Sequence, residues 1–131
     1  MNFHESSIKQ LLNRVMPFVF GFGLVLATVL LLIPSYAVPK AFDFYDKTQH
    51  VLMFATLTMA GLLAYPQRSK TTVWGVVFYG GLMEVLQSLL TTTRHGDWAD
   101  WLADSVGITV ALGAYWSSQK FVKYTINKIA A

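Results

Sequence analysis

The residues best suited to chemistry in this chain are carboxylates that lie inside or beside long apolar segments. Glu84 stands within an apolar run, and Gln87 and Ser88 follow it by three and four residues. At helical spacing these three side chains share one face. An ionised carboxylate in apolar surroundings needs a partner or water, because otherwise its pKa rises until it is neutral. Glu84 is therefore the strongest candidate for acid–base chemistry, with Gln87 as a candidate substrate-binding neighbour.

A second stripe of acids precedes the last apolar segment. Asp97, Asp100, Asp104 and Gly107 follow one another at intervals of three, four and three residues, which places them on one face of a helix that begins near residue 97. Asp97 and Asp100 are candidate catalytic groups, and Asp104, one turn deeper, is a candidate substrate-binding group. Two structural alternatives stay open, since Asp97 also suits a helix N-cap and Asp100 suits the positive end of the helix dipole.

A third stripe opens the second apolar segment, where Asp46, His50 and Phe54 are four residues apart. His50 is a candidate acid or base, and Asp46 is a candidate substrate-binding group. Arg94 precedes the acidic stripe and is the natural counter-charge for it. Its guanidinium fork suits a carboxylate or a phosphate, so Arg94 is also a candidate substrate-binding residue.

These acids and one imidazole also form a set of ligands that would suit a divalent metal. The residues concerned are Asp46, His50, Glu84, Asp97, Asp100 and Asp104. The chain has no cysteine and no dedicated metal motif such as HExxH. The sequence therefore assigns no metal ligands and identifies no cofactor, and metal binding is kept as the lesser alternative.

The elements that must position these residues are membrane spans. Of 131 residues, 54% are hydrophobic and 13% are charged, whereas soluble domains carry about 25% charged residues. The sequence predicts one all-α domain over 1–131, with four transmembrane helices in one bundle. The expected spans are about 17–33, 47–65, 72–90 and 98–121.

The segment before the first span is polar on one side. Residues 2–14 either lie on the membrane surface, as a short interfacial segment, or extend the first helix. The apolar run that follows is longer than that of a signal peptide, and prolines flank the potential cleavage site, so we expect it to remain as a span.

The loop charges predict the orientation. Seven Lys and Arg residues lie on one side and three on the other, and the larger set marks the cytoplasmic side of a bacterial inner membrane. The larger set is Lys9, Arg14, Arg68, Lys70, Lys120, Lys123 and Lys128, and the smaller set is Lys40, Lys47 and Arg94. Both termini are thus expected in the cytoplasm. The acidic stripes are expected at the outer side.

The order of these motifs resembles that of the VanZ-like membrane protein family. The matching residues are Asp46-Lys47-x-x-His50-x-x-x-Phe54, Tyr79-Gly80, Glu84-x-x-Gln87 and Arg94-x-x-Asp97-x-x-Asp100-x-x-x-Asp104-x-x-Gly107. They cover roughly residues 46–107. The family typically has Asn at the position of Asp104, so this chain adds an acid there. The resemblance implies a small helical protein of the cell envelope, related to proteins associated with teicoplanin resistance.

Together these patterns predict an outward-facing polar site that binds or processes a lipid-linked or phosphate-bearing envelope substrate. The main alternative is a non-catalytic accessory protein whose polar cluster locks the bundle, and a small transporter is the third. Whether the protein is an enzyme stays open. The lipid bilayer is the expected partner, with a second copy or another membrane protein left as an alternative. The basic residues are scattered at span ends, which argues against nucleic-acid binding.

Overall fold

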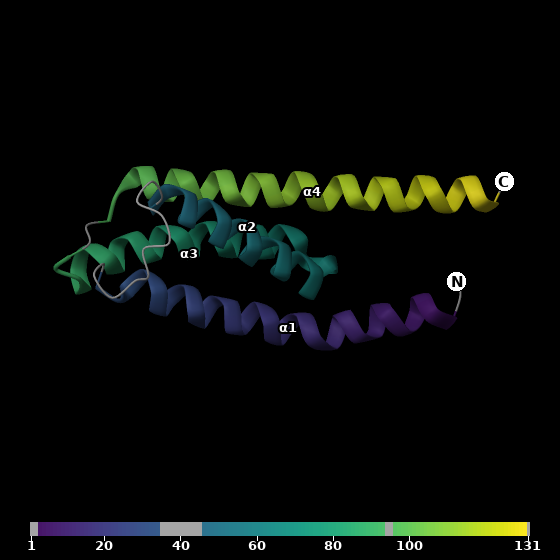
Figure 1. Ribbon diagram of the computed structural model, residues 1–131, viewed down its shortest axis with the longest axis horizontal. Helices are drawn as coiled ribbons and strands as arrows, with labels where there is room; N and C mark the ends of the chain where they lie inside the picture. Colours follow the sequence, from purple (N-terminus) through teal and green to yellow (C-terminus); the bar gives the residue numbers. More distant parts are fainter. Residues whose placement is uncertain (1–2, 35–45, 94–95, 131) are drawn as a thin grey trace.

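The computed structural model describes residues 3–34, 46–93 and 96–130, and this part of the chain is a helical bundle without strands (Figure 1). Its elements are α1 (Phe3–Leu32), α2 (Asp46–Ala64), a 3-10 turn η2 (Pro66–Arg68), α3 (Ser69–Leu90) and α4 (Trp98–Ala130). The all-α prediction is confirmed. The expected boundaries of the second and third segments agree with α2 and α3 to within three residues.

Two helices are longer than the apolar runs that predict them. α1 is continuous from Phe3 and contains Pro17, so the N-terminal segment extends the first helix and is not a separate interfacial element. α4 continues to Ala130, beyond the expected limit near residue 121. Hydropathy marks only the apolar part of a helix, whereas polar residues such as Lys, Gln, Glu and Arg also have a high helix propensity and can extend it. By contrast, Pro66 follows the end of α2 directly and opens η2.

α2 and α3 are the central helices, since each of them contacts the other three helices. Within the described ranges α1 and α4 do not contact each other and flank the other two helices (Figure 1). Both chain ends lie at one end of the bundle, where α1 and α4 extend beyond the turn between α2 and α3 (Figure 1). The opposite end brings together the start of α2, the end of α3 and the start of α4.

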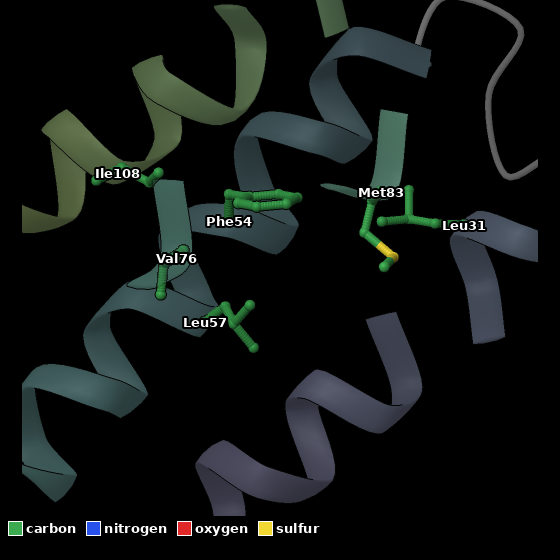
Figure 2. Packing of buried hydrophobic residues seen from close by; sticks show 6 residues of the cluster. All are labelled: Leu31, Phe54, Leu57, Val76, Met83 and Ile108. Carbon is green, nitrogen blue, oxygen red and sulfur yellow. The ribbon is translucent and has the colours of Figure 1, made fainter. Parts of the chain in front are cut away.

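Each helix contributes to one apolar core. Its buried members are Leu31, Phe54, Leu57, Val76, Met83 and Ile108 (Figure 2). Gly107 lets α4 approach α2 closely, because a Cβ added there would collide with the carbonyl oxygen of Val51 and would lie 3.0 Å from the amide nitrogen of Ala55. Small residues at helix contacts are typical of membrane bundles, in which packing drives association.

Two helical segments of the described chain are long and apolar enough to cross a membrane: Ile8–Leu32, with mean hydropathy 2.5, and Pro66–Leu90, with mean hydropathy 1.4. Only 11% and 28% of their apolar windows are buried within the bundle. A helix at the core of a soluble protein would be mostly buried. α2 and α4 do not meet the same criterion, so the prediction of four spans is supported for two helices and stays a prediction for the other two.

Candidate functional site

Polar side chains from three helices meet at the end of the bundle opposite the chain termini. His50 comes from α2, Glu84 from α3 and Asp104 from α4, and all three are buried. One nitrogen or oxygen atom from each lies within 4.8 Å of the corresponding atoms of the other two. Residues far apart in the sequence thus form one cluster, which we call the buried triad.

His50 and Asp104 form the innermost pair of the buried triad. His50 Nδ1 lies 2.8 Å from Asp104 Oδ1, and the side chains are 2% and 1% exposed. The imidazole is stacked against Phe54, with ring centroids 6.4 Å apart. Gly80 makes room for the pair, because a Cβ at that position would lie 2.8 Å from Asp104 Oδ2. Oδ2 itself has no hydrogen-bond partner among the described residues.

Glu84 joins the end of α3 to the start of α4. Its Oε2 accepts a hydrogen bond from the backbone N–H of Asp97 at 2.9 Å. Ser88 Oγ accepts one from the N–H of Gly96 at 3.0 Å and donates to the carbonyl of Glu84 at 3.1 Å. A Cβ on Gly96 would collide with that carbonyl, which explains the glycine there. Glu84 Oε1 is buried and has no partner in the described part of the chain.

Asp97 caps α4, as the structural alternative predicts. Its Oδ1 accepts a hydrogen bond from the N–H of Ala99 at 2.9 Å, and the helix begins at Trp98. This hydrogen bond lowers the pKa of the Asp97 carboxyl below its ordinary value, and the nearby Lys47 ammonium adds to the effect. Asp97 is therefore ionised at neutral pH, and a catalytic role for it stays a prediction.

Lys47 supplies a counter-charge that sequence reasoning did not assign to the site. Its Nζ lies 2.9 Å from Asp100 Oδ1 and 3.5 Å from Asp97 Oδ2. The Asp100 side chain is 8% exposed, whereas that of Lys47 is 57% exposed. The ion pair thus covers the site on its more exposed side. The signal in the sequence is the spacing of Lys47 and His50, three residues apart on one helical face.

The side chain of Gln87 forms its hydrogen bond outside the buried triad. Its Nε2 donates to the carbonyl of Leu31 at 2.9 Å, which satisfies one of the carbonyls that the end of α1 leaves free. This contact gives Gln87 a helix-joining role, and substrate binding by it stays a prediction. Arg94 lies outside the described residues. Asp46 begins α2, but its side chain is also outside the described part.

A groove of about 360 Å³ opens beside the triad, between α3 and α4. Its lining residues are Gly81, Glu84, Val85, Ser88, Gly96, Asp97, Trp98 and Trp101. Glu84 belongs both to this groove and to the buried triad. Another hollow, of about 440 Å³, lies between α1 and α3 and is lined by no carboxylate. The groove at Glu84 therefore gives a ligand access to two carboxylates, those of Glu84 and Asp97.

Comparison of the chain with protein-family models, with curated proteins and with solved structures found no match. The resemblance to VanZ-like proteins accordingly rests on the order and spacing of its motifs alone.

Proposed function

We propose that the protein is an integral membrane protein that binds the head group of an amphiphilic envelope lipid in the groove between α3 and α4. The observation that carries the proposal is the composition of this groove. Glu84 and Asp97 offer acids at its base, and Trp98 and Trp101, which are 76% and 44% exposed, stand at its side. Tryptophan is typical of the membrane–water interface, where its ring lies at head-group level.

The distribution of exposed apolar side chains supports the membrane environment. Large hydrophobic residues are exposed along every helix, among them Phe18 at 80%, Phe78 at 73% and Phe121 at 71%. A soluble monomer rarely exposes apolar surface on this scale. Lipid would cover these side chains, and a groove that opens sideways between two helices would then receive a lipid from the bilayer itself.

The acids beside the groove support processing of the head group as well as binding. Glu84 is buried, whereas the side chain of Asp97 is half-exposed and hydrogen-bonded to backbone. Carboxyl groups in such different surroundings can divide acid and base roles. His50 stands behind Glu84 in the triad, and Asp100 pairs with Lys47. Arg94 and Lys47 are the basic residues closest in sequence to these groups and would offset the charge of a phosphate.

Filling the groove tests this function. Gly81 lines it, and a Cβ there would lie 3.5 Å from Trp101 Nε1, so Gly81→Leu should occupy the space without a backbone collision. We expect mass spectrometry of purified wild-type protein to detect a specifically retained lipid, and Gly81→Leu to retain at least about tenfold less, since each 1.4 kcal/mol of lost contact is tenfold in affinity.

Gly113→Leu is the matched control, because it adds the same side chain to α4 where no atom lies within 4 Å of the new Cβ. It should retain lipid as the wild type does. Equal retention by wild type and Gly81→Leu would refute the proposal.

A structural lock is the second candidate, and the closed ion pairs of Lys47 with Asp97 and Asp100 favour it. If the polar cluster serves only to hold the helices together, Glu84→Gln and Asp100→Asn should lower the melting temperature and the lipid retention in parallel. Loss of retention at an unchanged melting temperature in detergent would exclude the lock as the sole role.

A further inference from the structure

We propose that the buried triad of His50, Glu84 and Asp104 binds a divalent transition-metal ion. The inference rests on the proposed function in one respect, since it places the ion at the base of the same lipid-binding groove. Sequence reasoning assigned no metal ligands because no motif joins these residues. Only the packing of α2, α3 and α4 brings them within 4.8 Å of one another.

Two buried carboxylate oxygens without a hydrogen-bond partner indicate a place for a cation. Asp104 Oδ2 and Glu84 Oε1 are buried, and neither has a hydrogen-bond partner among the described residues, although the side chains' other oxygens do. The two residues are 1% and 9% exposed. A buried polar atom without a partner is destabilising, and the more so when it carries charge. A cation between them would satisfy both oxygens at once.

Charge balance supports the same assignment. Two ionised carboxylates and a neutral imidazole carry a charge of −2, which a divalent cation cancels. Lys47 is directed to Asp97 and Asp100 and is largely exposed, so it does not neutralise the triad. Burying unpaired charge is costly, whereas a metal centre is a common way to keep carboxylates inside a protein.

The ligand set selects the kind of ion. One imidazole with two carboxylates favours Zn²⁺ or Mn²⁺ over Mg²⁺ or Ca²⁺, which prefer oxygen ligands alone. Ligand atoms about 2.1 Å from a tetrahedral ion lie about 3.4 Å apart, so modest side-chain rotations would close the site. Three protein ligands leave a coordination position open, as in catalytic zinc sites. Because Glu84 also lines the groove, that position would be available to an anionic head group.

Direct metal titration tests the site without reference to lipid. Tag-free protein in detergent is stripped with EDTA, and binding of Zn²⁺, Mn²⁺ and Mg²⁺ is measured by calorimetry, with bound metal counted by mass spectrometry after desalting. We expect one Zn²⁺ or Mn²⁺ per chain and much weaker Mg²⁺ binding. Asp104→Asn and Glu84→Gln should each weaken binding at least about 100-fold, since loss of a direct ligand should cost no less than the roughly 10–100-fold typical when a residue that only orients a ligand is replaced.

Thr58→Val is the matched control, because Thr58 Oγ1 is also buried without a partner but lies outside the triad. It should bind metal as the wild type does, and melting curves of all variants show whether they are folded. Wild-type protein that binds no Zn²⁺ or Mn²⁺ would overturn the proposal, as would folded Asp104→Asn that binds as the wild type does.

The lipid proposal and the metal proposal can be refuted independently of each other. Lipid retention that is the same with and without EDTA, in a protein that takes up no metal, would refute the metal site and leave the lipid site intact. Stoichiometric metal in a protein that retains no lipid would support the metal site and refute the proposed function.

Discussion

Replacing His50 by alanine is expected to destabilise the bundle by about 3 kcal/mol, at the upper end of the cost of leaving a buried acceptor without its hydrogen-bond partner. The pair is almost inaccessible, at 2% and 1% exposure, and its atoms are 2.8 Å apart. Asp104 would lose the only hydrogen-bond partner that its carboxylate has among the described residues. Unfolding in detergent, with EDTA present so that metal binding makes no contribution, measures the effect.

The double variant His50→Ala/Asp104→Ala separates this charge effect from loss of packing. It removes both groups, so it leaves a void but no orphaned carboxylate. Its cost should be well below the sum of the two single variants, with a coupling energy of about 1–3 kcal/mol. Additive costs would show that the side chains act independently and that the pair does not hold α2 to α4.

The second large effect is expected at Gly107, where α4 crosses α2. A Cβ at this position collides with the carbonyl oxygen of Val51, which is backbone and cannot turn aside. Gly107→Ala should therefore push the helices apart and cost about 3 kcal/mol, at the upper end of the range for overpacked cores. The displacement would also separate His50 from Asp104, so we expect the variant to lose metal and lipid binding with its stability.

Gly113→Ala gives the comparison for this variant within the same helix. No atom lies within 4 Å of its added Cβ, so the substitution should be neutral or should stabilise α4 by up to about 1 kcal/mol through helix propensity. Chemical unfolding of the two variants side by side measures the difference. If Gly107→Ala is as stable as Gly113→Ala, close helix approach at Gly107 is not required by the fold.

Spacing along the sequence predicts the faces of this bundle well and its contacts less well. The i, i+3 and i, i+4 stripes place Glu84, His50 and Asp104 at similar depth, and in the structure these residues meet. The hydrogen-bond partners of these residues depend on how the helices are rotated and packed. The Glu84 carboxylate receives a backbone N–H from Asp97, and no pattern of side chains can reveal a main-chain donor.

The partner of a charged side chain is the feature that the sequence predicts least reliably. Arg94 is the expected counter-charge of the acidic stripe, and it lies outside the described residues. Lys47, whose position at the start of an apolar run suggests no special role, instead contacts Asp97 and Asp100. Lysine has a long flexible stem, so its partner depends on which helices are neighbours. Similarly, the polar site residues that α2 and α4 carry lower the mean hydropathy of these helices, and neither helix meets the criterion for a membrane span.

The unequal helix lengths have a mechanical consequence for a protein in a bilayer. α2 has 19 residues and α4 has 33, which correspond to about 28 Å and about 50 Å at 1.5 Å per residue. At the end of the bundle that holds the chain termini, α1 and α4 extend beyond the turn between α2 and α3 (Figure 1). If the bundle spans a bilayer as proposed, these overhanging turns would accommodate a change in bilayer thickness. In the proposed membrane setting, the groove would keep its depth relative to the nearer leaflet, so that one protein could bind the same lipid head group in thin and thick membranes.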